Sequence, residues 1–205
     1  MRVLRIPFST NVERVALALG HKGIAVDWVD VDPADRGEVE RLSGQSLVPV
    51  FEDGGTVVAD STEIIRYLEQ RHPKPRLLPA DPARRTELEL FVDWFNRVWK
   101  RSPNELADEL SRLEPDAALV ERLSVALAGA LPLFDDLLEG RDYLFGDEFS
   151  AADCAVFPFL KYAVLPLPDG DDEPFHRILR ERQPLDRRHS RLRAWILRVD
   201  ERPRA

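Results

Sequence analysis

The sequence predicts an α/β fold followed by an all-α fold, with the element order βαβ-ββα in the first part and helices alone in the second. Short segments with strand alternation occur only before His72. Four prolines lie between His72 and Ala83, too many for a helix or a central strand. After Ala83 the apolar residues recur at helical spacing. We therefore expect two domains.

The first predicted elements are a strand over residues 2–6 and a helix that includes Val12–Leu19, where apolar residues recur every three or four positions. Thr10 stands three residues before Glu13, which is the spacing of a capping box. We expect Thr10 to cap this helix, and Gly20 with Gly23 to end it. Ser9 then lies at the mouth of the helix.

The rest of the first part continues the βαβ-ββα order. Residues 25–31 alternate as a strand, and a weak helix is expected around Val39 and Leu42. Two short strands, 48–52 and 56–59, flank the hairpin turn at 53–55. Asp60 and Ser61 precede an apolar helical pattern, with Glu63 three residues after Asp60, so another capped helix begins there.

The proline-rich segment sets the predicted domain boundaries: a first domain at 1–76, a linker at 77–83 and a helical domain at 84–205. Apolar stripes predict helices from Leu88 to Trp99 and from Leu119 to Phe134, with breaks at Pro103 and Pro115. Phe149-Ser150-x-x-Asp153 has the pattern of a helix start. Residues 166–174 form an acidic loop, and 175–199 return to helix.

Composition limits the functional classes. The chain has 205 residues, of which 44% are apolar and 32% charged, as expected for a globular protein. We see no run of about 18 apolar residues and no apolar stretch of a secretory signal, so we expect no membrane span and a cytoplasmic protein. The single cysteine, Cys154, excludes dithiol redox chemistry and a zinc cluster, and we expect no metal site.

The charge distribution is uneven. The net charge of −8 argues against general nucleic-acid binding. Residues 176–205 nevertheless hold ten arginines against four acids. These arginines alternate with apolar residues at helical spacing, so we interpret them as a solvated helix face, and an anionic partner is the alternative.

Five segments, taken in this order, resemble the cytosolic glutathione S-transferase family across nearly the whole chain. They are Phe8-Ser9-Thr10-Asn11-Val12-Glu13-Arg14-Val15, Val48-Pro49, Asp60-Ser61, Leu77-Leu78-Pro79-x-Asp81-Pro82 and Phe149-Ser150-x-x-Asp153. The resemblance implies a thioredoxin-like first domain that binds a thiol and an all-helical second domain that supplies much of the second-substrate pocket. It also implies glutathione as co-substrate, a small electrophile as the second substrate, and a homodimer.

Ser9 occupies the place that serine-type and cysteine-type members of the family use, so the resemblance implies that it is catalytic. Thiol conjugation needs the thiolate, and lowering a thiol pKa of about 8.5 by about two units requires roughly 2.7 kcal/mol. A hydrogen bond to a charged group supplies about 1.5 to 3 kcal/mol. A helix N-terminus adds about 0.3 to 1 kcal/mol. The alternative is that Ser9 only ends a strand or caps backbone groups.

The ligand-binding residues implied by the resemblance are Val48, Pro49, Asp60 and Ser61. It implies a cis bond at Val48-Pro49, and the exposed backbone of Val48 can then pair with the cysteinyl main chain of a bound tripeptide. Asp60 offers an acceptor for an ammonium group. Ser61 and the helix N–H groups offer donors for a carboxylate. Ordinary helix capping is the alternative for Asp60 and Ser61.

Four aromatic residues are candidates for the second-substrate pocket: Phe8, Phe91, Trp94 and Tyr162. Aromatic residues at helical spacing also occur in ordinary cores, which is the alternative. Trp94 lies off the apolar stripe of its helix, and we interpret it as support for a homodimer interface, with core packing again as the alternative.

One departure from the family concerns the thiol. Many relatives have Asn-Pro-x-Gly-Lys before Val-Pro, whereas this chain has Ser43-Gly44-Gln45-Ser46-Leu47 and lacks the basic residue. Gln45 or Arg36 can take its place, the ligand can be another small thiol, or there is none. Two function classes follow: an enzyme that activates a low-molecular-weight thiol, and a non-catalytic binding or regulatory protein with the same fold.

Overall fold

The computed structural model describes all residues, 1–205, and divides into two compact units. The first unit is Met1–Pro79 together with Glu201–Ala205, and the second is Ala80–Asp200. From the sequence, the last five residues were expected in the helical domain. In the structure they return to the first unit.

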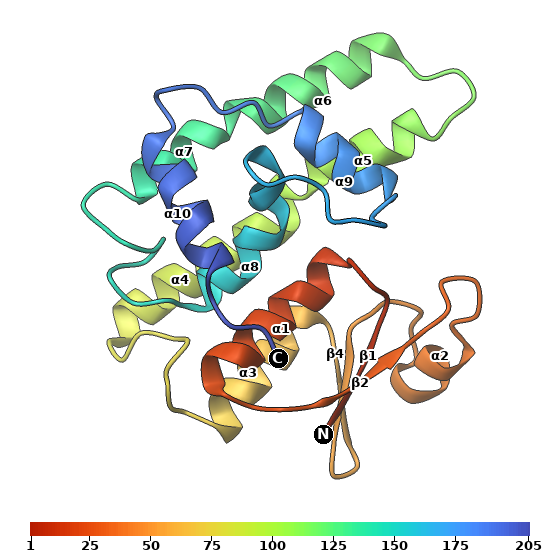
Figure 1. The fold of residues 1–205 in the computed structure, drawn as a ribbon, viewed down its shortest axis with the longest axis vertical. Helices are drawn as coiled ribbons and strands as arrows, with labels where there is room; N and C mark the ends of the chain where they lie inside the picture. The colour runs from red at the N-terminus through yellow and green to blue at the C-terminus, as the bar shows by residue number, and fades with distance from the viewer. The chain divides into compact units, whose positions relative to one another are not determined.

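The first unit has the predicted βαβ-ββα order (Figure 1). Figure 1 also shows α1 and α3 on one side of the strands and α2 on the other. Its elements are β1 (Arg2–Arg5), α1 (Thr10–Lys22), β2 (Asp27–Asp30), α2 (Gly37–Ser43), β3 (Val50–Asp53), β4 (Thr56–Ala59) and α3 (Ser61–Arg71).

The four strands form one mixed sheet in the order β2-β1-β3-β4. Strand β1 pairs with β2 in parallel and with β3 in antiparallel orientation, with Leu4 opposite Val50. Strands β3 and β4 form the predicted hairpin, with Val50 opposite Ala59. Leu4 and Val50 are buried in one hydrophobic cluster with Val31 and Val39, and burying such a side chain contributes about 1.5 to 3 kcal/mol.

The start of α1 differs from the prediction. Its N-cap residue is Ser9, and Thr10 is the first helical residue. The Glu13 carboxylate does not close a capping box. It accepts hydrogen bonds from the Arg204 guanidinium at 3.1 and 3.2 Å instead. The helix ends at Gly23 as predicted, and this glycine adopts a left-handed conformation with φ of 65°.

The C-terminal segment Glu201–Ala205 packs along α1 and against β2. The Ala205 N–H donates to the Ala16 carbonyl at 3.2 Å, and the Ala205 carbonyl accepts from Trp28 Nε1 at 3.1 Å. A Cβ atom placed on Gly20 would lie 2.1 Å from the Pro203 carbonyl oxygen. Gly20 therefore lets this segment approach the helix closely.

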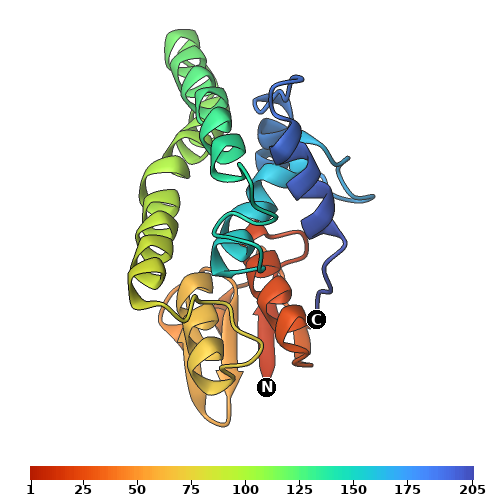
Figure 2. The same ribbon diagram turned by 90° about the vertical axis from the view of Figure 1, so that its left-hand side faces the viewer.

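The second unit is all helical (Figure 2). Figure 2 shows α5 and α6 as neighbours in the part of the unit drawn in green. Its elements are α4 (Pro82–Trp94), the π-helical η1 (Phe95–Trp99), α5 (Arg101–Leu110), α6 (Ala117–Gly129), α7 (Leu131–Leu137), α8 (Ala151–Leu160), the 3₁₀ turn η2 (Lys161–Ala163), α9 (Pro174–Glu181) and α10 (Ser190–Asp200).

The predicted break at Pro103 is wrong. Pro103 lies in the first turn of α5, where the missing N–H costs little. The helical path is instead irregular one turn earlier, in the π-helical segment Phe95–Trp99. The break at Pro115 is confirmed, because Asp116 caps α6 by accepting from the amides of Ala118 and Leu119. The predicted helix over 175–199 is interrupted between α9 and α10.

Trp94 is not an unexplained exposed aromatic residue. It is half-buried, with its ring 5.7 Å from that of Phe91 and 6.2 Å from that of Phe134. The core-packing alternative therefore accounts for Trp94, and this residue no longer supports a dimer interface.

The predicted helix start at Phe149-Ser150-x-x-Asp153 is confirmed. Ser150 and Asp153 form a capping box at α8. The buried Asp153 carboxylate also accepts from the Leu144 amide at 3.0 Å and from Trp195 Nε1 at 2.8 Å. Burial nevertheless raises the pKa of Asp153 above its ordinary value. Cys154, next to it, is fully buried in this core.

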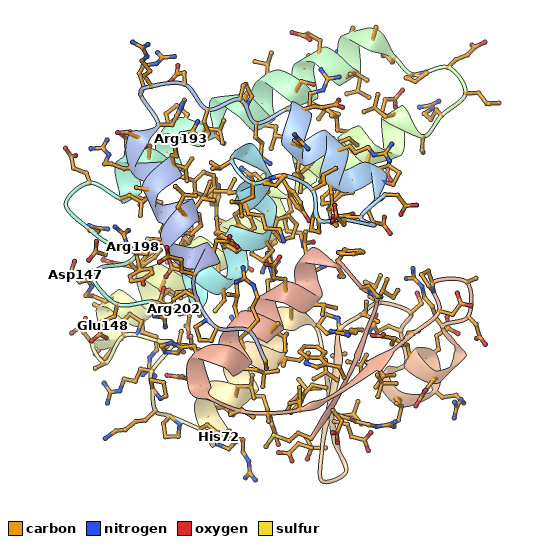
Figure 3. The ribbon with its side chains drawn as sticks, viewed as in Figure 1. His72, Asp147, Glu148, Arg193, Arg198 and Arg202 are labelled. Atoms are coloured by element: carbon orange, nitrogen blue, oxygen red, sulfur yellow. The ribbon has the colours of Figure 1, made fainter.

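Several arginines of the basic C-terminal stretch have partners within the chain. Arg198, labelled in Figure 3, donates to the Asp142 carbonyl at 2.6 Å, and Arg191 donates to the Asp135 carboxylate at 2.9 Å. Arg202 donates to His21 Nδ1 at 2.7 Å. Arg188, Arg191, Arg198 and Arg204 also form salt bridges with acidic side chains, so part of the local positive charge is balanced within the chain.

One segment departs from the expectation about membranes. Ala117–Leu137, which contains α6 and α7, is long and apolar enough to cross a membrane when judged by length and composition alone. The expectation that no such segment exists is therefore wrong in that respect. The same test is passed by core helices of soluble proteins, so it is weak support for a membrane span.

Candidate functional site

The sheet register brings three predicted site segments to the same end of the sheet. Ser9 follows the carboxyl end of β1, and Val48-Pro49 precedes the amino end of β3, which runs antiparallel to β1. Asp60-Ser61 follows the carboxyl end of β4, because Ala59 lies opposite Val50. Residues from three distant parts of the sequence therefore meet at one edge of the first unit.

Ser9 lies half-buried at the N-terminus of α1. Its carbonyl accepts the first helical hydrogen bond, from the Glu13 amide at 3.0 Å. Its side chain makes no capping hydrogen bond. The hydroxyl of an N-cap serine usually accepts a hydrogen bond from a backbone amide of the first turn. The Ser9 hydroxyl makes no such bond and remains available beside the positive end of the helix.

The residue before Ser9 has an unusual backbone. Phe8 has φ of 64°, in the left-handed region that bulky residues rarely adopt, and the residue is 40% exposed. Outliers of this kind persist where the surrounding structure fixes them, often beside functional sites. The turn between β1 and α1 thus presents Phe8 and Ser9 together.

Val48 and Pro49 lie where β3 begins. Their peptide bond is cis, as the family resemblance implies. The β3 ladder starts at Val50, and the backbone N–H and carbonyl of Val48 have no hydrogen-bond partner within the chain. The unpaired backbone of Val48 can therefore receive an extended peptide as an added strand.

Asp60 and Ser61 begin α3. Asp60, with φ of 72°, caps the helix through Oδ1, which accepts from the Thr62 and Glu63 amides at 2.7 and 3.3 Å. Both capping bonds end on one oxygen, which leaves Oδ2 as an acceptor. Capping and ligand binding are therefore compatible functions of Asp60. The Ser61 amide is the first of α3 and is not used by the cap.

Arg14 of α1 lies beside the start of α3, a position that the sequence motif alone did not predict. Arg14 is 2% exposed, and its Nη1 donates to Ser61 Oγ at 3.3 Å. The positive charge of Arg14 beside Ser61 favours the binding of an anion at the start of α3. The available signal was the position of Arg14 among the apolar residues of α1, Val12 and Val15.

The loop before Val48 has a fixed structure. Gln45 Nε2 donates to the Leu47 carbonyl at 2.7 Å, and Gln45 Oε1 accepts from the Leu47 amide at 2.5 Å. Arg36 donates to the carbonyls of Pro33 and Ser46 at 3.2 and 3.1 Å. Both residues named as replacements for the missing basic residue are thus engaged in holding the backbone.

The four predicted residues of the second-substrate pocket lie in different units. Phe8 belongs to the first unit, whereas Phe91, Trp94 and Tyr162 belong to the second. Phe91 and Trp94 are half-buried neighbours. Tyr162 is 2% exposed and stacks on His176 with ring centroids 4.8 Å apart. A shared pocket for these four stays a prediction.

The structure contains no group of three or more His, Cys, Asp or Glu side chains placed to hold a metal ion. His21, the histidine nearest to Ser9 in sequence, lies in the last turn of α1. It hydrogen-bonds the Arg76 carbonyl at 3.0 Å. The first turn of α1 therefore carries no histidine that could act as a base beside Ser9.

Two family models match the chain. The model described as "Glutathione S-transferase, N-terminal domain" matches residues 4–76. The model described as "Glutathione S-transferase, C-terminal domain" matches residues 117–198. The first match includes all three segments that meet at the sheet end.

Named relatives include both transferases and another class of protein. Glutathione S-transferase 3 of Zea mays is 30% identical over 181 residues, which cover 82% of this chain and 81% of the relative. The Stringent starvation protein A homolog of Coxiella burnetii is 28% identical over 157 residues, which cover 75% of this chain and 71% of the relative.

The fold is shared with solved structures. The theta class glutathione S-transferase of Xanthomonas axonopodis pv. citri, solved with glutathione bound, has a TM-score of 0.75 and 24% identity, and the match covers 98% of this chain and 93% of that one. At that identity the likeness establishes the fold alone. The first unit is thus a thioredoxin-like domain, and the second is the helical domain that accompanies it.

Proposed function

The chain belongs to the glutathione S-transferase family, and we propose on that basis that it is an enzyme that binds glutathione and activates its thiol for attack on a small electrophile. The observation that carries the proposal is the convergence of Ser9, Val48 and Ser61 at one end of the sheet. Each offers a group suited to one part of the tripeptide.

The amino-acid end of glutathione binds at the start of α3. Asp60 Oδ2 accepts from the ammonium group, while the Ser61 hydroxyl and the N-terminal amide of α3 donate to the carboxylate. Arg14 donates a hydrogen bond to Ser61 Oγ and places a positive charge near the bound carboxylate. The cysteinyl main chain pairs with the free backbone groups of Val48.

Ser9 then acts on the thiol. Its hydroxyl donates a hydrogen bond to the thiolate sulfur and is not itself a nucleophile. The thiol proton leaves to solvent, the thiolate forms a carbon–sulfur bond with the electrophile, and the leaving group takes the bonding electrons. The hydrogen bond and the end of α1 together supply about 2 to 4 kcal/mol, enough to lower the thiol pKa by about two units.

The second candidate is a non-catalytic binding or regulatory protein. The similarity to a Stringent starvation protein A homolog supports it, because that protein is not named as a transferase. The segment Ser43–Leu47 supports it as well, because it lacks the basic residue that many relatives have before Val-Pro. A homodimer in the cytoplasm is expected in either case, and sedimentation at micromolar concentration tests the dimer.

Two measurements separate the candidates. A thermal-shift titration with glutathione detects binding, since a ligand at 100 times its Kd stabilises the protein by about 2.7 kcal/mol. Turnover with a generic aryl halide detects transfer. Binding with turnover supports the enzyme, and binding without turnover supports the regulatory protein. The absence of both binding and turnover would contradict the proposed enzyme and leave the regulatory protein as the remaining candidate.

A further inference from the structure

The C-terminal segment Glu201–Ala205 brings a basic side chain to the first turn of α1. Figure 1 shows the end of the chain beside this helix. The Arg204 guanidinium donates to Glu13 Oε1 through Nε at 3.2 Å and through Nη2 at 3.1 Å. The two residues are 191 positions apart in the sequence, so folding alone brings them together.

The ion pair is partly shielded from water. The side chains of Arg204 and Glu13 are 29% and 14% exposed. Salt screens partly buried charges less than fully exposed ones. Arg204 Nη1 also donates to the Arg202 carbonyl at 3.0 Å, so the guanidinium is held by the carboxylate and by its own segment.

The segment is anchored to α1 on both sides of Arg204. Arg202 donates to His21 Nδ1 at 2.7 Å, in the last turn of the helix. The Ala205 N–H donates to the Ala16 carbonyl at 3.2 Å, nearer the start of the helix. These contacts place Arg204 along α1 independently of its ion pair.

Glu13 lies one helical turn from Ser9, and its amide donates to the Ser9 carbonyl at 3.0 Å. One turn rises about 5.4 Å, which is less than the Debye length of about 8 Å at physiological ionic strength, so charges at the two positions interact. A carboxylate in the first turn offsets the positive potential that a helix N-terminus offers to an anion. The Arg204 charge counters this carboxylate.

Other charged groups of the first unit also lie at the starts of α1 and α3. Arg14 donates to Ser61 Oγ, and Asp60 caps α3. Glu63, in the first turn of α3, pairs with Arg66. The pKa of a thiol at the start of α1 therefore reflects several charges. Substitutions at Glu13 and Arg204 leave these groups in place and isolate the effect of one ion pair.

We infer that Arg204 is a positioning residue for the thiolate: by pairing with Glu13, it preserves the positive potential at the start of α1, where Ser9 meets an anionic sulfur. The part of this inference that concerns glutathione rests on the proposed function. Arg204 acts through Glu13 and needs no contact with the thiol. Loss of Arg204 leaves an unbalanced carboxylate one turn from Ser9, whereas loss of the Glu13 charge leaves an unbalanced cation there.

The test places a thiol in the protein itself. Ser9→Cys puts a sulfur atom at the N-cap of α1, and the rate of alkylation by iodoacetamide, measured against pH, gives the pKa of this thiol, because the thiolate is the form that displaces iodide. Cys154 is fully buried, and the wild-type protein gives its background rate. The measurement needs no glutathione.

The two substitutions should have opposite effects in the Ser9→Cys protein. Arg204→Gln should raise the thiol pKa by about 0.3 to 0.8, and Glu13→Gln should lower it by about the same amount. The protein with both changes should return to within about 0.2 of the Ser9→Cys value. Arg204→Lys keeps the charge and should also stay within about 0.2. Addition of about 1 M NaCl should reduce both shifts at least twofold.

Arg2→Gln is the matched control. Arg2 is another ion-paired arginine of the first unit, with its Nε 2.6 Å from the Glu52 carboxylate. It begins β1, whereas Ser9 follows the other end of that strand. Its replacement in the Ser9→Cys protein should leave the thiol pKa unchanged.

Equal thiol pKa values in the Ser9→Cys protein with and without Arg204→Gln would overturn the inference. A rise with both Arg204→Gln and Glu13→Gln would also overturn it, because loosening of the helix start, and not charge, would then be the cause. Failure of glutathione to bind the wild-type protein would overturn the proposed function and leave these expected pKa shifts unchanged.

Discussion

Arg14 and Ser61 are joined by a hydrogen bond of 3.3 Å from Nη1 to Oγ, although they are 47 positions apart in the sequence. Arg14 belongs to α1 and Ser61 is the first residue of α3. Both side chains are buried. The bond therefore ties the helix that carries Ser9 to the helix that receives the amino-acid end of the ligand.

Removal of the Arg14 charge should weaken thiol binding more than turnover. In Arg14→Met the long apolar stem is kept, but Ser61 loses its donor and the ligand carboxylate loses a nearby positive charge. We expect the KM for glutathione to rise about five- to twentyfold while kcat changes less than about threefold, since Arg14 does not touch the thiol. Steady-state kinetics with the thiol varied measures both constants.

The double variant with Ser61→Ala provides the control. Residues that act through one contact show coupling of about 0.5 to 3 kcal/mol in a double-mutant cycle. We expect Arg14→Met to raise the KM much less when Ser61 is already alanine. Fully additive effects on the KM would show that Arg14 acts independently of Ser61.

Gly20→Ala should release the C-terminal segment. The new Cβ would lie 2.1 Å from the Pro203 carbonyl oxygen, so the segment must move. We expect a loss of about 1 to 3 kcal/mol in the free energy of unfolding. Trypsin should also cut faster after Arg204, because displacement of the segment exposes this residue, and mass spectrometry follows the cleavage.

Gly129→Ala is the matched control. Gly129 is also helical, and a Cβ on it would meet nothing within 4 Å. Its replacement should leave stability unchanged or raise it by up to about 1 kcal/mol, because alanine favours a helix more than glycine does. Equal cleavage after Arg204 in both variants would contradict the close contact with Pro203.

His21 should make stability depend on pH. Burial is the main cause that lowers the pKa of His21 below its ordinary value of 6.5, and the Arg202 charge lowers it further, against the opposing hydrogen bond to Arg76. The unfolded chain then binds more protons than the folded one just below pH 6.5. This contribution to stability is complete above pH 6.5 and is lost as the pH falls through the lowered pKa.

Urea unfolding at pH 7.5 and 5.5 tests the effect of His21. The free energy of unfolding of the wild-type protein should fall more between these values than that of His21→Gln, in which the other three histidines are unchanged. A drop of the same size in both proteins would show that His21 does not titrate differently in the folded state.

Local patterns predicted most of the fold because they reflect local physics. Alternating apolar residues and the Asp53-Gly54-Gly55 turn indicated the hairpin. The capping box at Ser150 indicated the start of α8. The C-terminal segment on α1 could not be predicted this way, because Gly20 and Pro203 meet only through tertiary packing.

The site was predicted less completely. Thr10 and Glu13 have capping spacing, but Arg204 binds Glu13, and Ser9 becomes the cap. The link from Arg14 to Ser61 joins two helices and leaves no mark on either segment alone. In both cases an arginine side chain contacts a residue far away in the sequence.

The central claim is that the Ser9 hydroxyl stabilises the bound thiolate. Ser9→Ala removes this donor but leaves the helix end in place, so about 1.5 to 3 kcal/mol of thiolate stabilisation should be lost. That loss corresponds to a rise of roughly one to two units in the pKa of the bound thiol. Ser9→Thr keeps a hydroxyl at the same N-cap and is the control.

The most direct measurement is the ultraviolet absorbance of the thiolate in bound glutathione, titrated against pH in the wild-type protein, Ser9→Thr and Ser9→Ala. We predict a wild-type midpoint about two units below the value of about 8.5 for a free thiol, a similar midpoint for Ser9→Thr, and a midpoint one to two units higher for Ser9→Ala. Superimposable titration curves for the wild-type protein and Ser9→Ala would contradict the claim and show that the Ser9 hydroxyl does not stabilise the bound thiolate.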